Sequence, residues 1–206
     1  LRGGVGNETP ILPLSTLGYF VLSVERPEFL IRGARLDPSA LQRETELDGS
    51  ERRAKREALL TFIDVAVVRG VDRQRIAITG LSDGAETVYA MLMDDPDRFA
   101  AAVVGSPPTD PASWPLQASS YRDRSLQRIG LTSPWVEDSP WAQWWRENSA
   151  SLHAERFTAP ILFNWAEAEA IRGFPLLARL HERGASYETY IYPGAYHIKL
   201  RPQHIW

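Results

Sequence analysis

The sequence predicts an α/β fold in which a mostly parallel sheet is flanked by helices. Three observations lead to this prediction: strand-like and helix-like segments alternate, a glycine-rich turn joins one strand to a helix, and the size suits one domain. The chain has 206 residues, of which 44% are hydrophobic and 24% are charged. These values are ordinary for a globular fold with a sizeable core. Repeated strand–helix–strand order implies parallel strands with helices covering the sheet.

Short apolar runs bounded by turn-forming residues predict the strands. In chain order they cover residues 19–25, 75–79, 100–104, 161–165 and 187–192. Helical spacing of apolar residues predicts helices over residues 51–68, 83–93 and 174–183. Gly70 and Gly184 lie just past the first and third of these helices, where a helix-terminating glycine is common.

Two stretches interrupt the alternation. Residues 26–50 show little periodicity, which predicts a loop. Residues 106–159 form a long connection that is rich in proline, serine and tryptophan. Because so long a connection inside a compact domain is usually functional, we expect a lid-like insertion here.

Composition and charge exclude several classes of function. The net charge of −3 argues against nucleic acid as a main partner, since phosphate binding requires a basic excess. The absence of cysteine excludes disulfides, thiolate zinc sites and cysteine nucleophiles. The histidines lack the spacing of a zinc site, so we expect no metal and no cofactor. No apolar run approaches the roughly 18 residues of a membrane span, so we expect none.

The clearest chemical signal is a serine between two glycines. Residues 80–84 read Gly-Leu-Ser-Asp-Gly and fit the G-x-S-x-G pattern. They follow an apolar strand and open an amphipathic helix, as a nucleophile elbow requires: a tight turn that projects the serine hydroxyl from the carboxyl end of the sheet. The alternative is an ordinary turn in which Ser82 caps the helix.

A serine nucleophile needs a base, and the base needs an orienting acid. Of the four histidines, His153, His181, His197 and His204, only His197 follows the last strand in a Pro-Gly loop. That position lies at the edge of the sheet to which Ser82 projects, so we expect His197 to be the base. The acid should follow the strand at 161–165, where Glu167 and Glu169 are both candidates.

From residue 51 to residue 197 the chain resembles the catalytic domain of the prolyl oligopeptidase family of serine peptidases. The matching segments are residues 71–76, 80–84, 159–162 and 192–197. The resemblance implies an α/β-hydrolase fold with the chain order Ser, acid, His. An alignment from Pro160 places the family's triad aspartate on Glu169, which favours Glu169 over Glu167.

Further segments resemble a narrower group, the bacterial lasso peptide isopeptidases. They are residues 1–8, 80–86, 148–154 and 196–199, and glutamate as the triad acid is similar to this group's pattern. The resemblance implies hydrolysis of the isopeptide bond that joins a lasso peptide's N-terminal amine to an Asp or Glu side chain. It also implies an N-terminal β-propeller domain in the same polypeptide. The compartment, bacterial cytoplasm or periplasm, stays open.

The resemblance also suggests how substrate is held. The backbone N–H of Asp83 is expected to form one half of the oxyanion hole, and the loop that contains Arg2 and Gly3 supplies the other half. Arg2, Glu86 and Trp135 are candidate substrate contacts. The plainer alternatives are that Glu86 stabilises the helix N-terminus and that the tryptophans pack the insertion onto a core.

By the same resemblance, residues 1–206 are expected to be part of a catalytic domain that lacks the first strands and the last helix of the fold. Two other functions remain open. One is a general peptidase or esterase of the prolyl oligopeptidase family, whose chemistry is shared. The other is a binding module for peptides in which the serine is idle.

Overall fold

Four parallel strands form one sheet in the computed structural model, which describes residues 11–24 and 38–199. The strands are β1 (Ala77–Gly80), β2 (Ala101–Val104), β3 (Ile161–Ala166) and β4 (Tyr187–Tyr192), and they lie side by side in that order. Gly80 pairs with Val104, and Val104 pairs with Phe163. The carboxyl ends therefore share one edge of the sheet, called the carboxyl edge below.

Eight α-helices and four 3₁₀ helices surround the sheet in the described residues. The α-helices are α1 (Ile11–Thr16), α2 (Pro38–Leu47), α3 (Ser50–Val68), α4 (Asp83–Asp94), α5 (Ser119–Ile129), α6 (Trp141–Asn148), α7 (Glu167–Ala170) and α8 (Phe174–Glu182). The 3₁₀ helices are η1 (Arg73–Arg75), η2 (Trp114–Leu116), η3 (Ala150–Arg156) and η4 (Ile171–Gly173).

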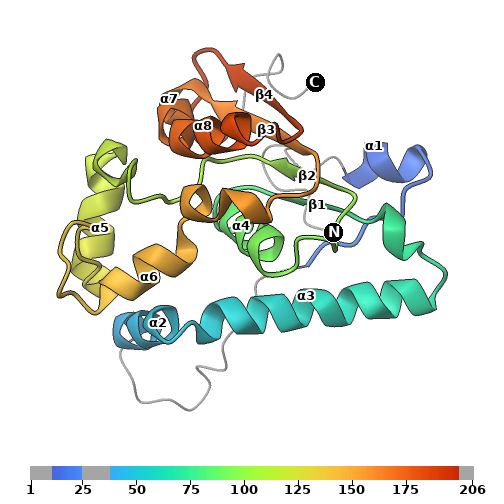
Figure 1. Ribbon diagram of the computed structural model, residues 1–206. Coiled ribbons are helices and arrows are strands. Elements are labelled where there is room, and N and C mark those ends of the chain that lie inside the picture. The colour runs from blue at the N-terminus through green and yellow to red at the C-terminus, as the bar shows by residue number, and fades with distance from the viewer. Residues whose placement is uncertain (1–10, 25–37, 200–206) are drawn as a thin grey trace.

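The main core lies between the sheet and α4. This helix packs on β1 and β2 and separates them from the long helix α3 (Figure 1). The buried side chains of α4 recur with the helical spacing that the sequence shows. Helix α8 and η3 cover the same side of the sheet. Fully buried members of this core include Ala85, Val88, Leu92, Phe163, Trp165, Leu176 and Leu180.

A second cluster of buried side chains lies in the insertion, residues 106–159. Its buried members are Trp114, Leu131, Trp141 and Trp145, and the half-buried Trp144 packs against them. The four tryptophans are called the tryptophan cluster below. The Trp145 ring makes edge contacts with the rings of Trp114 and Trp144, at centroid distances of 5.2 and 5.0 Å. Leu47 of α2 packs against the cluster. The insertion thus has a small core of its own.

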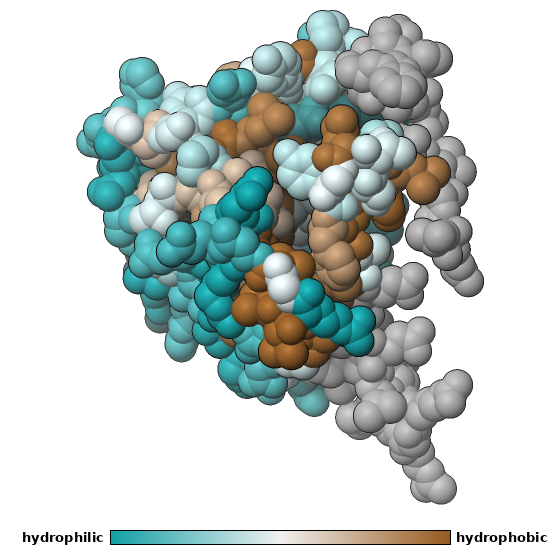
Figure 2. All heavy atoms as spheres, turned by 90° about the vertical axis from the view of Figure 1, so that its right-hand side faces the viewer, coloured by the Kyte–Doolittle hydropathy of each residue, from teal (hydrophilic) through white to brown (hydrophobic). Residues whose placement is uncertain are grey.

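One face of the molecule carries exposed apolar patches. Figure 2 shows hydrophobic side chains gathered on the side that carries α1 and the C-terminal end of α3. Exposed apolar side chains in α1 and shortly after it include Leu12, Leu17 and Phe20, and those of α3 include Phe62 and Val68. A large exposed apolar patch generally marks a surface that another segment or partner covers.

The predicted fold class is confirmed, and so are the last four strands and all three helices, with ends shifted by at most two residues. Two predictions are wrong in the described residues. Residues 19–24 form no strand, because no neighbouring strand supplies backbone partners, and Phe20 is exposed. The stretch predicted as a loop contains α2, which packing against α3, α5 and α6 stabilises. Within residues 11–24 and 38–199, no helix is long and apolar enough to cross a membrane.

Candidate active site

Ser82 occupies the turn between β1 and α4 in a strained conformation. Its backbone angles are φ 57° and ψ −122°, and it is the only residue other than glycine with positive φ in the described part of the chain. Such a conformation costs free energy and persists only where the surrounding structure enforces it. The serine is exposed at the carboxyl edge, as a nucleophile elbow requires.

The glycine at the end of β1 makes the sharp turn possible. A Cβ on Gly80 would lie 2.2 Å from the carbonyl oxygen of Gly84, whereas a Cβ on Gly84 would meet nothing within 4 Å. Only the first glycine of the motif is therefore required by close packing. Two residues past the end of β2, the Ser106 hydroxyl accepts a hydrogen bond from the Ser82 backbone N–H at 3.2 Å.

The first turn of α4 leaves one backbone donor available beside the serine. The N–H groups of Gly84, Ala85 and Glu86 donate to the carbonyls of Leu81 and Ser82. In the described residues, by contrast, no acceptor takes the N–H of Asp83. A free N–H at a helix N-terminus favours a developing negative charge.

Glu169 and His197 meet at the same edge of the sheet. Glu169 lies in α7, directly after β3, and His197 follows the turn after β4. Glu169 Oε1 lies 2.8 Å from His197 Nδ1. Glu167 does something else: its Oε2 accepts a hydrogen bond of 2.7 Å from the backbone N–H of Gly194, in the turn that leads to the histidine.

Electrostatics keep the Glu169 carboxylate ionised. Burial raises its pKa, but the hydrogen bond from His197 and the charges of Arg172, His197 and Lys199 together outweigh burial, so that the pKa is lowered. Arg172 Nη2 lies 2.8 Å from Glu169 Oε1. An ionised acid beside the imidazole holds it in one tautomer and stabilises its protonated form.

The structure describes two of the remaining candidate residues, Glu86 and Trp135. Glu86 accepts hydrogen bonds from the backbone N–H and the hydroxyl of Thr109, at 2.8 and 2.7 Å. Burial raises the pKa of Glu86. Trp135 is 68% exposed, in contrast to Trp114, Trp141 and Trp145, which are buried. Arg2 and Gly3 lie outside the described residues.

Sequence reasoning missed three residues that brace the site. Lys55 of α3 lies 2.7 Å from Asp83 Oδ1 and 2.9 Å from Glu51 Oε1. Arg172 lies three positions after Glu169, a spacing at which helical side chains meet, so this signal could have been used. Nothing in the sequence signals the hydroxyl of Ser106, because its contact depends on the pairing of β1 with β2.

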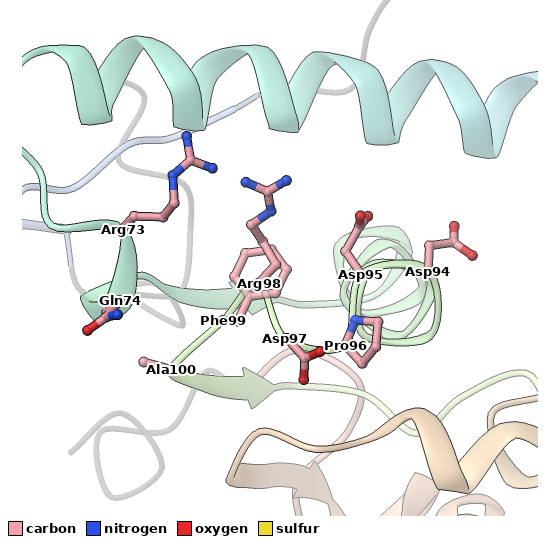
Figure 3. A pocket seen from close by; sticks show the side chains of 9 residues that line it. All are labelled: Arg73, Gln74, Asp94, Asp95, Pro96, Asp97, Arg98, Phe99 and Ala100. Carbon is pink, nitrogen blue, oxygen red and sulfur yellow. The ribbon is translucent and has the colours of Figure 1, made fainter.

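One surface hollow lies away from the candidate active site. A surface hollow lined by Arg73, Asp97 and Arg98 lies at the amino ends of β1 and β2, opposite the carboxyl edge, and both arginines point toward α3 (Figure 3). In the described ranges, no group of three or more His, Asp or Glu side chains could hold a metal ion.

Comparisons with known proteins identify the family of this chain. The profile of the Prolyl oligopeptidase family matches residues 64–205. Lasso peptide isopeptidase AtxE2 of Asticcacaulis excentricus is 34% identical over 206 aligned positions, and the alignment covers 99% of this chain and 29% of the relative. The chain thus spans less than a third of the length of that relative.

Solved structures give the same result. The apo structure of AtxE2 isopeptidase covers 99% of this chain and 31% of its own, with 34% identity and a TM-score of 0.86. A serine-to-alanine variant of AtxE2 with astexin3-dC4 bound matches equally well, at 33% identity. An acylaminoacyl peptidase of Pyrococcus horikoshii shares the fold alone, with 20% identity over 62% of this chain, 20% of its own chain and a TM-score of 0.51. The chain belongs to the prolyl oligopeptidase family.

Proposed function

We propose that this chain carries the catalytic centre of an enzyme that opens lasso peptides by hydrolysing their isopeptide bond. Ser82 is the nucleophile, His197 the base and Glu169 the orienting acid. The observation that carries the proposal is the 2.8 Å contact between Glu169 and His197, at the edge to which the strained Ser82 projects. The substrate class is supported by the 34% identity to AtxE2 over 99% of the chain.

In the first half of the reaction, Ser82 Oγ attacks the carbonyl carbon of the isopeptide bond and its proton passes to His197 Nε2. The resulting oxyanion is met by the N–H of Asp83 and by a second donor, for which we propose Gly3. The carbon–nitrogen bond then breaks and His197 gives its proton to the departing amine. This leaves an ester between Ser82 and the former side-chain carboxyl.

In the second half, His197 takes a proton from water while the water oxygen attacks the ester. The ester bond to Ser82 breaks, and the serine regains its proton from the histidine. The products are a free N-terminal amine and a free side-chain carboxylate. One water is consumed, so the peptide gains the mass of one water and loses its ring.

Of the three candidate substrate contacts outside the triad, we propose two and give the third a structural role. We retain Trp135 as a proposed contact, because its exposure contrasts with the four packed tryptophans, and Arg2 because of the resemblance. The two bonds of Glu86 to Thr109 support a structural role for this residue instead.

We further propose that this chain works together with other segments of the same polypeptide, a β-propeller domain among them. Two observations support this: the curated relative is more than three times as long, and the side of α1 and α3 is apolar and exposed (Figure 2). A covering segment would bury Leu12, Leu17 and Phe20.

The experiment incubates the intact protein with a threaded lasso peptide, its unthreaded linear analogue and a simple ester, and follows products by mass spectrometry. We expect a gain of one water on the threaded peptide only. Equal turnover of the linear peptide would indicate a general peptidase instead. Turnover of the ester alone would indicate an esterase. Absence of fluorophosphonate labelling at Ser82 would leave only a binding module.

A further inference from the structure

One arginine joins the proposed triad acid to the insertion. Arg172 of η4 places Nη2 at 2.8 Å from Glu169 Oε1 and Nη1 at 2.6 Å from Gln117 Oε1. Gln117 directly follows η2 in the insertion and is only 8% exposed. A single planar guanidinium thus bridges two side chains that are far apart in the sequence.

The carboxylate of Glu169 depends on this bridge for its orientation. Its Oε1 accepts a hydrogen bond from His197 and forms the ion pair with Arg172, whereas its Oε2 is buried and has no hydrogen-bond partner in the described residues. With one oxygen engaged, the imidazole alone would leave the carboxylate free to rotate about that contact. The ion pair of Arg172 with Oε1 restricts this freedom.

The bridge is also shielded from water. The side chains of Arg172 and Glu169 are only 11% and 14% exposed. A charge at short range in such surroundings acts far more strongly than one on the surface. The charged groups that act on Glu169 are Arg172, His197 and Lys199, and Arg172 also acts on Glu86.

We propose that Arg172 is a positioning residue that fixes Glu169 for His197 and couples this dyad to the seating of the insertion through Gln117. This inference rests on the triad proposed above. When the insertion is seated, Gln117 holds the guanidinium against Glu169. When the insertion shifts, the Gln117 contact breaks, and Arg172 and the carboxylate lose their fixed orientation. The insertion thereby acts on the base without touching the substrate.

The charge of Arg172 and its planar geometry predict separate effects. Without the charge, both members of the dyad take up protons more readily, so the active form, a carboxylate beside a neutral imidazole, is lost at a higher pH. Without the planar fork, a charge remains but cannot bridge two acceptors. Arg172→Met tests the first effect, and Arg172→Lys separates it from the second.

The experiment measures the rate of fluorophosphonate labelling of Ser82 against pH in the intact protein, which requires no lasso peptide. Arg172→Met is expected to lower the plateau of the pH–rate profile on the order of tenfold. It is also expected to move the acidic limb of that profile, where the rate falls with pH, to higher pH. Arg172→Lys is expected to restore the limb but not the plateau. Gln117→Ala is expected to lower the plateau and leave the limb in place. Arg179→Met is the matched control, because Arg179 pairs with Glu182 at the same spacing on α8.

Two outcomes overturn the inference or part of it. If Arg172→Met keeps the rate and limb of Arg179→Met, Arg172 is merely structural. If Gln117→Ala behaves as the unchanged protein, the coupling to the insertion is wrong. If Arg172→Met does not fold, Arg172→Lys and Gln117→Ala decide the matter at equal melting temperature. Labelling of Ser82 without cleavage of any lasso peptide would overturn the proposed substrate and leave the role of Arg172 intact.

Discussion

The carboxyl edge and the tryptophan cluster are stabilised in opposite ways. At the edge, a strained Ser82 and two ion bridges, Lys55 to Asp83 and Arg172 to Glu169, hold polar groups in fixed positions. In the cluster, aromatic rings pack at 5.0–5.6 Å and are buried by one another. The reacting groups therefore depend on the orientation of their polar contacts, whereas the insertion depends on side chains that fill its core. Small changes of chemistry should therefore affect the edge, and changes of size should affect the cluster.

The largest effect is expected for Ser82→Ala. Loss of the nucleophile should lower kcat by roughly 10⁴- to 10⁶-fold, measured by linearisation of the lasso peptide. The melting temperature should not fall, because the hydroxyl contributes no packing and the strain stays. Near-normal turnover in this variant would remove the mechanism proposed for the edge.

A smaller effect is expected where the shape of the acid is kept and its charge removed. Glu169→Gln should lower kcat by roughly 10²- to 10⁴-fold, because a neutral amide neither fixes the tautomer nor stabilises the imidazolium. Glu167→Gln is the control: the amide oxygen still accepts from the Gly194 N–H, so kcat should change only a few-fold. A greater loss in the Glu167 variant would reverse the assignment of the acid.

Size rather than charge is the test of the cluster. Trp145→Ala removes a ring that contacts both Trp114 and Trp144, and should lower the free energy of unfolding by about 3–5 kcal/mol. Limited proteolysis should then cut within residues 106–159. Trp135→Ala, at an exposed position, should stay within about 0.5 kcal/mol of the original chain. Similar losses in the two variants would mean that Trp135 is also part of the packing.

The two glycines of the motif separate geometry from sequence pattern. Gly80→Ala would force a Cβ against the Gly84 carbonyl and should cost about 2–3 kcal/mol in the free energy of unfolding. Gly84→Ala meets open space and should be neutral or stabilising, since alanine is the better helix former. Chemical denaturation of both variants measures this contrast. Equal losses would contradict the view that only Gly80 is sterically required.

Local patterns predicted the elbow because strand, turn and helix follow one another without a break, and each has its own periodicity. The parallel direction of the strands and the edge that carries His197 followed from the same alternation. The braces could not be predicted in this way. Gln117 and Arg172 are 55 positions apart, and their contact exists only because the insertion folds back onto η4. The missing strand at residues 19–24 is a related case, since a strand forms only where a neighbour can pair with it.

The smallest effect is expected for Glu86→Gln. This variant tests whether an ionised carboxylate that takes no part in catalysis lowers the stability of the carboxyl edge. Burial raises the pKa of Glu86 above its ordinary value of 4.5, against the opposing bonds from Thr109. An acid with a raised pKa binds its proton more tightly in the folded protein, so folding is most favoured at low pH and loses that stability as the pH rises through the raised pKa. At pH 7 the ionised carboxylate therefore costs stability. Glutamine, which still accepts from Thr109, should raise the free energy of unfolding.

This gain in stability should disappear as the pH falls below 4.5, and KM for the lasso peptide should not change. A raised KM with no gain in stability would instead make Glu86 a contact for the substrate.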